Sequence, residues 1–363
     1  MKKAFIYAYD HINLGDDLFV RALVNRYPMV QFFLWSDQKN ISVFQDCKNL
    51  KIIDKNSRYV KFLTKIRPSL AARYQEKWKV KSDAVIYIGG SIFMEYPTWE
   101  NIVNWWNYQT QHYKFYVLGA NFGPYQTEAY RESMGAMMNG LQDVCFRDRY
   151  SYELFCKDVK TVRQAPDILF GYPMPQIRQK KKQIYISVIN CAKKEDGKFL
   201  RFKKQYESII EKMIQSFLED GYKIKLVSFC REEGDEETVK DLADRFENHR
   251  RRREIQQLNY DGRNQEVILE ELAASEYVIA TRFHAIVLGL AAEQNVYPVI
   301  YSDKSKNMLK DIGFLGEYLD IRSMNDFDLE KMKQERKRNN RINFSSIRLE
   351  SQRHFEVLDH EFL

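Results

Sequence analysis

The sequence lacks cysteine pairs and long apolar runs. Its cysteines form no CxxC pair and are odd in number; they are Cys47, Cys145, Cys156, Cys191 and Cys230. This pattern favours neither a disulfide framework nor a zinc site, and we expect a reducing, cytoplasmic environment. The longest apolar run beyond the N-terminus, Ala285–Ala292, is far shorter than the roughly 18 residues that span a membrane.

The N-terminus lacks the features of a signal peptide. Residues 1–17 read MKKAFIYAYDHINLGDD, and acidic residues interrupt the apolar stretch too early for a secretory leader. We expect the first β-strand there instead. The six histidines show no metal-ligand spacing, so we expect neither a metal nor a bound cofactor.

Charge of one sign is only mildly in excess. Lys and Arg number 57 against 50 Asp and Glu, for a net charge of +7 and a pI near 8.9. This excess suits anionic ligands or contact with the inner face of a membrane, and it does not indicate nucleic acid. With 363 residues, 44% hydrophobic and 14% aromatic, the chain can fill two globular cores.

Short β-rich runs alternate with amphipathic segments, which predicts an α/β fold of two Rossmann-like domains facing across a cleft. Pro173, Pro175 and the basic run Arg178–Lys182 mark a linker at residues 171–182. We therefore expect an N-terminal domain at 1–172, a C-terminal domain at 183–325 and a charged helical arm at 326–363. The expected strands are Ala4–Ala8, Gln31–Trp35, Leu50–Ile53, Ala84–Ile88, Phe115–Leu118, Asp143–Phe146, Gln183–Asn190, Lys223–Phe229, Tyr277–Ala280 and Val296–Tyr301.

The segment Ser275–Tyr301 carries the strongest single signal. A predicted strand runs into Arg282 and His284, and a helix of small residues follows. The amides and dipole of a helix N-terminus attract anions, and the guanidinium adds forked donors. The segment predicts a site for a phosphate or carboxylate.

Other candidates lie where predicted strands end. Asn13, Gly15 and Asp16 follow the first strand; they either cap a helix or bind a ligand's hydroxyl groups. The turn Gly89, Gly90, Ser91 offers close backbone approach. It matches neither the GxGxxG fingerprint nor the P-loop.

Further charged residues follow other strands. Arg147 and Asp148, with Ser151, either pair with each other or face the cleft, and Asp167 follows a proline. Lys304 is either an anion contact or an ordinary surface lysine.

Two more segments allow alternative readings. The aromatic stretch Tyr96–Tyr108 either lines a sugar-binding cleft or packs into a helical core. The run Arg250–Arg253 is either a solvated surface or a contact to anionic lipid head groups.

Taken in order, the motifs resemble the polysaccharide pyruvyl transferase family over about residues 1–316. The most specific piece is ATRFHA followed by YSDK. The matching pieces are NLGD (13–16), GGS (89–91), GP (123–124), RDRYS (147–151), PD (166–167), ATRFHA (280–285) and YSDK (301–304).

The resemblance implies a GT-B-like fold and transfer of pyruvate from phosphoenolpyruvate onto a saccharide or lipid-linked saccharide, as a ketal. Arg282, His284 and Lys304 are then candidates for holding the donor, with His284 as the proton carrier. The candidate bases are Asp16, Asp148 and Asp167. The remaining candidates, lining the cleft or the acceptor site, are Asn13, Gly15, Gly89, Gly90, Ser91 and Arg147.

The sequence also departs from the family pattern. No Gly precedes the NLGD turn, and no Arg ends the strand Gln183–Asn190, where Lys193 and Lys194 are the nearest cations. Two rival functions remain at this point: a GT-B glycosyltransferase using a nucleotide sugar, and a non-catalytic saccharide-binding protein. The EX7E signature of many retaining glycosyltransferases is absent around residues 266–293, which weighs against the first rival.

Overall fold

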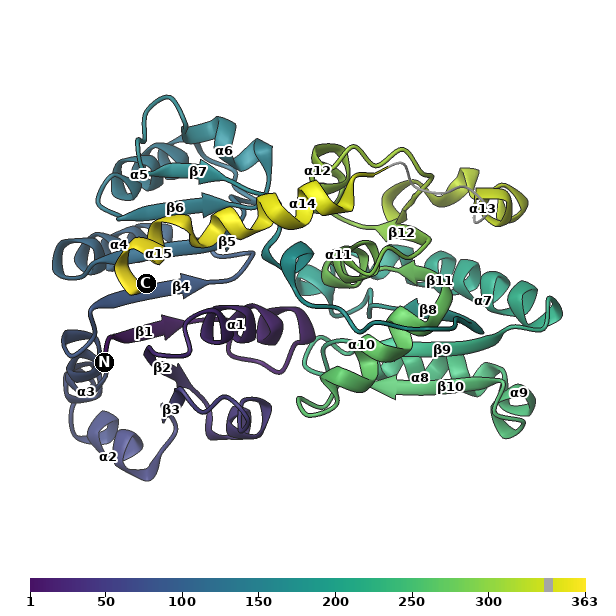
Figure 1. The fold of residues 1–363 in the computed structure, drawn as a ribbon, viewed down its shortest axis with the longest axis horizontal. Helices are drawn as coiled ribbons and strands as arrows, with labels where there is room; N and C mark the ends of the chain where they lie inside the picture. The colour runs from purple at the N-terminus through teal and green to yellow at the C-terminus, as the bar shows by residue number, and fades with distance from the viewer. Residues whose placement is uncertain (336–341) are drawn as a thin grey trace. The chain divides into compact units, whose positions relative to one another are not determined.

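A computed structural model describes residues 1–335 and 342–363 (Figure 1). Contacts between residues divide the chain into two compact units. One contains residues 1–10, 16–168 and 349–363, and the other contains residues 11–15 and 169–348. Each unit is built on one parallel sheet and is described by itself.

The first sheet has seven parallel strands in the order β3-β2-β1-β4-β5-β6-β7 (Figure 1). The chain moves outward from β1 to β3 and then returns to place β4 beside β1, with Ala4 opposite Ala84. Its strands are β1 Lys3–Tyr7, β2 Gln31–Ser36, β3 Leu50–Asp54, β4 Ala84–Ile88, β5 Phe115–Ala120, β6 Asp143–Phe146 and β7 Val162–Gln164.

Helices connect these strands. Ser57 caps α2 by accepting a hydrogen bond from the amide of Val60, and Pro68 opens α3, where its missing N–H costs nothing. The helices are α1 Leu14–Arg26, α2 Arg58–Ile66, α3 Pro68–Val80, α4 Trp99–His112, α5 Glu128–Met138 and α6 Arg149–Phe155.

The second sheet has six parallel strands in the order β10-β9-β8-β11-β12-β13. Its strands are β8 Lys181–Ser187, β9 Lys223–Ser228, β10 Ile255–Asn259, β11 Ser275–Ala280, β12 Val296–Ile300 and β13 Leu319–Asp320. Its helices are α7 Lys203–Glu219, α8 Asp235–Arg245, α9 Glu247–Arg251, α10 Gln265–Ala274, α11 Phe283–Ala291, α12 Asp303–Asp311 and α13 Leu329–Glu335.

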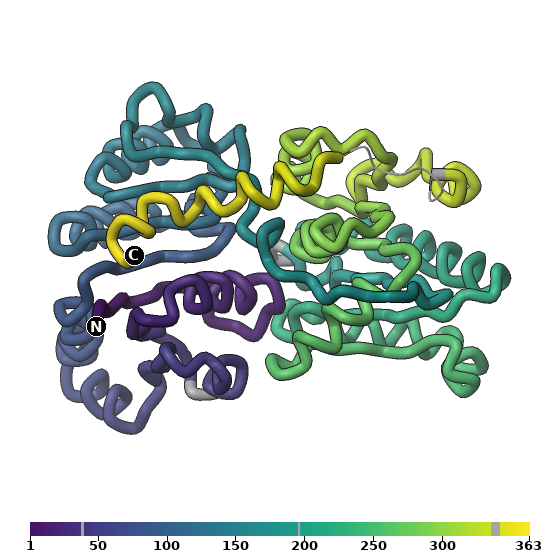
Figure 2. The backbone as a smooth tube through the Cα atoms, in the orientation of Figure 1, coloured from purple at the N-terminus to yellow at the C-terminus, as the bar shows by residue number. Residues whose placement is uncertain are grey.

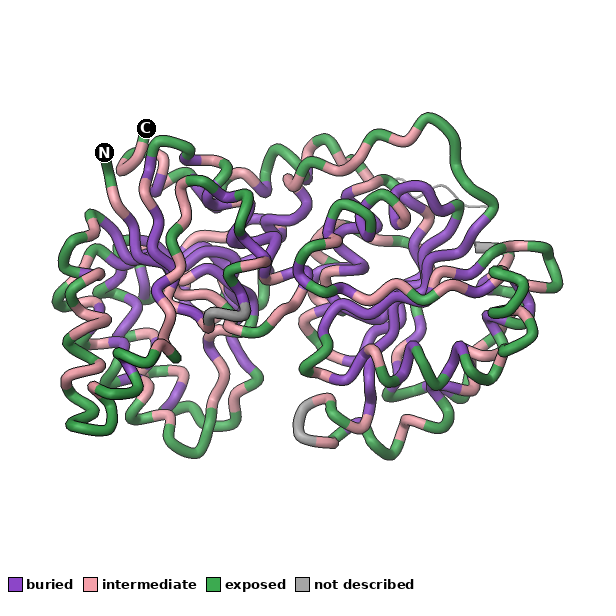
Figure 3. The backbone as a smooth tube through the Cα atoms, turned by 90° about the horizontal axis from the view of Figure 1, so that it is seen from below, coloured by how far each residue is buried: buried purple, intermediate pink, exposed green. Residues whose placement is uncertain are grey.

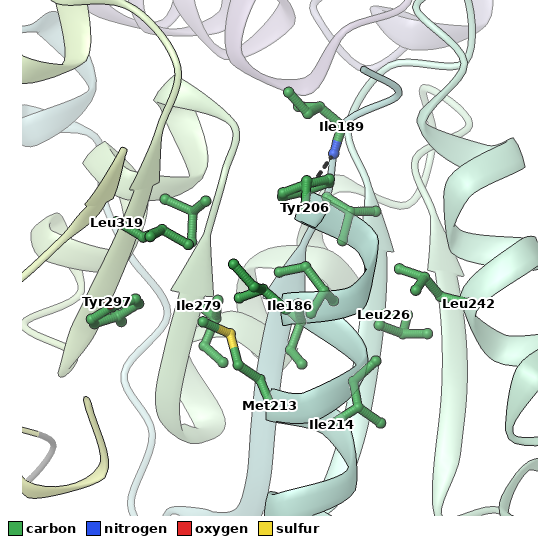
Figure 4. Packing of buried hydrophobic residues seen from close by; sticks show 14 of the residues in the cluster. Ile186, Ile189, Tyr206, Met213, Ile214, Leu226, Leu242, Ile279, Tyr297 and Leu319 are labelled. Atoms are coloured by element: carbon green, nitrogen blue, oxygen red, sulfur yellow. Dashed lines mark hydrogen bonds between the residues drawn. The ribbon is translucent and has the colours of Figure 1, made fainter. Parts of the chain in front are cut away.

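Each sheet has its own hydrophobic core, because parallel strands with helical crossovers bury apolar side chains. Figure 3 shows the buried strands inside and the exposed helix surfaces outside. In the second unit, Met213 and Ile214 of α7 pack with Ile186 of β8 and Ile279 of β11 (Figure 4). The Tyr206 hydroxyl closes this core by accepting a hydrogen bond from the Ile189 amide at 3.3 Å.

The C-terminal arm is helical, as predicted, and its end packs on the first sheet. It comprises α14 Phe344–Ser351 and α15 Glu356–Phe362 after α13, while residues 336–341 lie outside the described part. Asp359 accepts hydrogen bonds from Arg26 at 2.6 and 2.8 Å and from the Tyr27 hydroxyl at 2.7 Å. This places the two chain ends close together (Figure 2).

The ten predicted strands are all present, and the two parallel sheets confirm the α/β class. Sequence reasoning did not name β7, β10 and β13. These strands are short or polar: β13 has two residues, β7 has three, and β10 reads IQQLN at the edge of its sheet. An edge or a short strand buries too little to need an apolar run.

The contact division differs slightly from the predicted linker. The two units separate between Ile168 and Leu169, and residues 349–363 of the predicted arm belong to the first unit. The predicted linker at 171–182 covers the last residue of the 3₁₀ turn Ile168–Gly171, the irregular residues 172–180 and the first two residues of β8.

Candidate functional site

The candidate residues lie at the carboxyl ends of the strands where each sheet changes direction. In the first sheet this switch point lies between β1 and β4, which are followed by residues 13–16 and 89–91. In the second sheet it lies between β8 and β11, which are followed by residues 188–194 and 281–284. Ligands of open α/β sheets bind at such points.

The turn Asn13–Gly15 contacts His284 within the second unit. Asn13 pairs with Cys230 in an isolated bridge, and the Leu14 amide donates to the Phe229 carbonyl at 3.2 Å. Gly15 lies so close to the imidazole that a Cβ there would overlap Nδ1 of His284. Only glycine fits this position, so the turn and His284 form one structural feature.

The side chain of Asn13 shapes this turn. Its Oδ1 accepts a hydrogen bond from the Gly15 amide at 3.2 Å. This is the capping role that sequence reasoning kept open beside ligand binding. Asn13 itself is only half-buried.

Arg282 is buried between two carboxylates. Its Nε donates to Asp235 at 2.7 Å, a second nitrogen donates to the same carboxylate, and Nη1 donates to Glu233 at 2.5 Å. Burial disfavours its charge, but both carboxylates outweigh this and raise the pKa of Arg282 well above its ordinary value. The guanidinium is therefore charged and firmly oriented.

Asp235 joins Arg282 to the turn at Asn13. Besides Arg282, this fully buried carboxylate accepts hydrogen bonds from the backbone amides of Phe229 at 3.3 Å and Cys230 at 3.1 Å. The same two residues hold the Asn13–Gly15 turn. A continuous chain of contacts thus fixes Arg282 and the turn at His284 relative to each other.

Lys194 and Tyr301 belong to the same cluster. Lys194 pairs with Glu233, and its ammonium lies 5.3 Å from the centre of the Tyr301 ring. Burial alone would raise the pKa of Glu233, yet Arg282 and Lys194 lower it to about 2. Glu233 is therefore ionised at neutral pH.

Positive charge dominates around the Tyr301 phenol. Burial by itself would raise its pKa, but Lys194, Lys304 and Arg282 lower it below its ordinary value of 10.0. Sequence reasoning named Lys304 and Arg282 as site residues, but it named Tyr301 only as part of the YSDK motif and Lys194 only as a nearby cation. The available signals were that motif and the pair Lys193 and Lys194, the cations nearest to the strand end where the family pattern places an arginine.

Lys304 and His284 have a common neighbour. The Lys304 ammonium lies 5.9 Å from the centre of the Phe283 ring, and the His284 ring centre lies 5.2 Å from the same ring. Lys304 follows β12 in the first turn of α12, where its charge also acts on Tyr301. The second unit thus gathers two lysines, an arginine and a histidine at one sheet end.

In the first unit, Arg147 is buried over Gly90. It donates to Asp167 at 3.1 Å and to the side-chain oxygen of Asn121 at 2.7 Å. A Cβ at Gly90 would overlap its guanidinium. Arg147 therefore connects the ends of β4, β5, β6 and β7. Ser91, the residue after Gly90, is exposed.

The three candidate carboxylates have different surroundings. Asp148 caps α6, accepting from the amide and hydroxyl of Ser151 at 2.8 and 2.9 Å, and it is buried. Asp167 is fully buried with Arg147. Asp16, in the first turn of α1, is half-buried, and its charge contributes to a raised pKa of Tyr87, chiefly an effect of burial.

The aromatic stretch Tyr96–Tyr108 and the arginine run Arg250–Arg253 contribute packing and surface ion pairs. Trp106 packs in the first core, whereas Tyr96 and Tyr108 are exposed. In the arginine run, Arg250 pairs with Asp244 and Arg251 with Glu247. Among the described residues no group of three His, Cys, Asp or Glu is arranged to hold a metal, and the five cysteines are free thiols.

Solved structures with the GT-B-like fold align over nearly the whole chain. Anabaena HepE in complex with UDP has a TM-score of 0.56 at 12% identity, covering 99% of this chain and 97% of that one. A UDP-GlcNAc 2-epimerase from Methanocaldococcus jannaschii, bound to UDP-GlcNAc and UDP, has a TM-score of 0.56 at 12% identity, with coverage of 99% and 100%. At this identity the likeness establishes the fold, and it confirms the GT-B-like prediction.

Sequence comparison gives a more specific result. The search of curated proteins found no match. The family model described as polysaccharide pyruvyl transferase matches residues 13–303, which begins at the Asn13 turn and ends one residue before Lys304. It covers strands of both sheets, without β1 and β13, and every motif that carried the resemblance except Lys304. The chain therefore belongs to the polysaccharide pyruvyl transferase family.

Proposed function

We propose that the protein transfers pyruvate from phosphoenolpyruvate onto a saccharide or lipid-linked saccharide of an exopolysaccharide, capsule or cell-wall polymer. The observation that carries the proposal is the cation cluster at the switch point of the second sheet, beside His284. A phosphate and a carboxylate on one small donor need several cations within one site. Family membership supports the same reaction.

The reaction itself defines what the site must supply. One sugar hydroxyl adds to C2 of phosphoenolpyruvate while C3 gains a proton, which gives a tetrahedral phospho-ketal. A second hydroxyl then displaces inorganic phosphate and closes the ketal ring. The first hydroxyl proton is balanced by the one added at C3, and the second leaves with phosphate, so no oxidant or reductant is needed.

The second unit supplies the donor side in this proposal. Lys304, His284 and the N-terminal turn of α11 bind the anionic groups, and Arg282 contributes a charge oriented by Asp235. His284 transfers the proton to C3, because imidazole changes its charge near neutral pH. Gly15 holds the imidazole in place by close packing.

Asp16 is the proposed base for the acceptor hydroxyl. Asp148 and Asp167 are buried and bound to partners that hold the fold, whereas Asp16 is half-buried and directly follows Gly15. A base must reach the hydroxyl that it deprotonates.

Ligand-dependent melting tests the donor. Phosphoenolpyruvate should raise the melting temperature, because a ligand bound only by the native state stabilises it, whereas UDP-sugars should do much less. Lys304→Gln removes a cation that the proposal places on the donor, so donor affinity should fall by about 1 to 3 kcal/mol. Lys310→Gln on α12 is the matched control for a lost cation and should bind normally.

The opposite ranking would favour the rival function. If UDP-sugars stabilise the protein and phosphoenolpyruvate at millimolar concentration does not, the chain is a nucleotide-sugar glycosyltransferase. If saccharides alone stabilise it, the non-catalytic reading is correct.

A further inference from the structure

The positive charge of the chain is concentrated in α2 and α3. Residues 58–81 contain eight Lys or Arg and a single acidic residue, Glu76. Their excess of seven equals the net charge of the whole chain, so the other residues are balanced overall. Such a local excess marks a surface for an anionic partner.

Seven of these cations are on the surface. The eighth, Lys79, is buried and pairs with Glu76 at 2.8 Å, so the only acidic group of the segment is already neutralised. The structure records no ion pair between the other seven and any described residue. The exposed cations are Arg58, Lys61, Lys65, Arg67, Arg73, Lys77 and Lys81.

Apolar side chains accompany these cations. Tyr59, Phe62 and Ile66 are 56%, 60% and 59% exposed, and Val80 at the end of α3 is 70% exposed. With 3.6 residues per turn, positions 59, 62 and 66 lie on one face of α2, and the cations at 58, 61 and 65 flank it. A helix with an apolar face beside a row of cations is typical of proteins that lie in a membrane interface.

The arginine run Arg250–Arg253, which begins in α9 and continues past its end, shows the contrast. Two of its four arginines pair with acidic neighbours, and Arg250–Arg253 include no apolar residue. Sequence reasoning considered lipid contact for that run. The structure favours α2 and α3 instead, because their charges are unneutralised and an apolar face accompanies them.

We propose that α2 and α3 dock the protein on an anionic phospholipid bilayer, with Phe62 and Ile66 inserted at the head-group level. A nucleic acid would use the cations but not exposed Phe and Ile side chains. A second copy joined through a twofold axis would oppose seven positive charges with seven more. No helix among the described residues is both long and apolar enough to cross a bilayer.

Vesicle sedimentation of the full chain tests the proposal. Binding should be strong to vesicles that contain phosphatidylglycerol, weak to pure phosphatidylcholine, and lost at high salt. The triple variant Lys61→Gln, Lys65→Gln, Arg67→Gln should bind about 100-fold more weakly, since each basic residue near an anionic surface contributes about a fivefold step. Phe62→Gln with Ile66→Gln should weaken binding at least about tenfold.

The control moves the same number of charges elsewhere. Arg250→Gln, Arg251→Gln, Arg252→Gln should bind vesicles like wild type, and circular dichroism should show every variant folded. Equal losses in both triple variants would mean that only net charge matters, which overturns the proposal. So would RNA binding that survives Phe62→Gln with Ile66→Gln while vesicle binding is absent, or dimerisation that this double variant abolishes. Vesicle binding needs no substrate, so its outcome is independent of the donor test.

Discussion

Both sheets carry a buried arginine directly after a strand, and the two arginines have different neighbours. Arg147 donates to the Asp167 carboxylate and to the Asn121 amide oxygen, whereas Arg282 donates to two carboxylates and lies near two lysines and a tyrosine. Glycines pack against both regions: Gly90 against Arg147 and Gly15 against His284.

In the proposed function, the difference separates an arginine that supports strand ends from one in the donor site. Arg147 pairs with the buried Asp167 and donates to Asn121, as a buried ion requires. Arg282 lies with Lys194 and Lys304 near Glu233 and Asp235, and the proposed donor would add its negative charge there. An arginine that follows a strand thus has different neighbours in the two sheets, and we expect its substitution to have different effects.

The largest expected effect tests the chemistry of the second unit. His284→Gln keeps hydrogen bonding but removes the titratable group, so turnover should fall about 10²- to 10⁴-fold with little change in donor affinity. Steady-state kinetics and donor titration measure this. His354→Gln is the control, since that histidine is buried in the first unit with Nε2 donating to the Pro166 carbonyl. Near-normal turnover in His284→Gln would assign it a positioning role.

The next effect tests the structural role of Arg147. Arg147→Met removes the ion pair of the buried Asp167, which should cost about 3 to 5 kcal/mol of unfolding free energy. Urea denaturation measures the loss, and adding Asp167→Asn should recover part of it. A variant as stable as wild type but unable to bind saccharide would place Arg147 in the acceptor site.

The two glycines allow a matched comparison. Gly15→Ala and Gly90→Ala each place a methyl group against a side chain, at a cost of about 1 to 3 kcal/mol if the neighbour moves. We expect Gly15→Ala to reduce turnover more than stability, because it displaces His284. Gly90→Ala should reduce stability more than turnover. Kinetics and thermal unfolding of both variants give the ranking, and the reverse ranking would contradict the comparison.

The smallest effect depends on pH. Burial lowers the pKa of His354 from 6.5 to about 3, despite hydrogen bonds to backbone carbonyls that raise it. The unfolded chain therefore binds this proton first, and stability should fall as the pH drops below about 6.5. From about pH 7.5 to pH 5 the loss should be about 2 kcal/mol. Urea unfolding at both pH values measures it, and His354→Gln should remove it.

Glu233 makes the second unit respond at lower pH. Its pKa of about 2 lies below the ordinary 4.5, so its contribution is present above about pH 4.5 and is lost as the pH falls toward 2. The loss of stability just below about pH 6.5 therefore measures protonation of His354 in the first unit. The loss below about pH 4.5 measures protonation of Glu233 in the second unit. A pH response that persists unchanged in His354→Gln would contradict this assignment.

The sequence by itself determined ten of the thirteen described strands, the two-sheet class and the strand-end location of the candidate residues. Apolar runs such as FYVLGA in β5, all six residues buried, make parallel strands recognisable. Because parallel strands carry their ligand sites at carboxyl ends, Arg282 and His284 were identifiable from their position after YVIA.

Only the tertiary structure decided what each charged residue contacts. Asp235 lies 47 positions from Arg282, and Lys194 reaches Glu233 across 39 positions. Ion pairing depends on distance in space, which no local pattern encodes. The packing of Gly15 on His284, and the exposure of Phe62 and Ile66 among unpaired cations, likewise follow from how distant segments fold together.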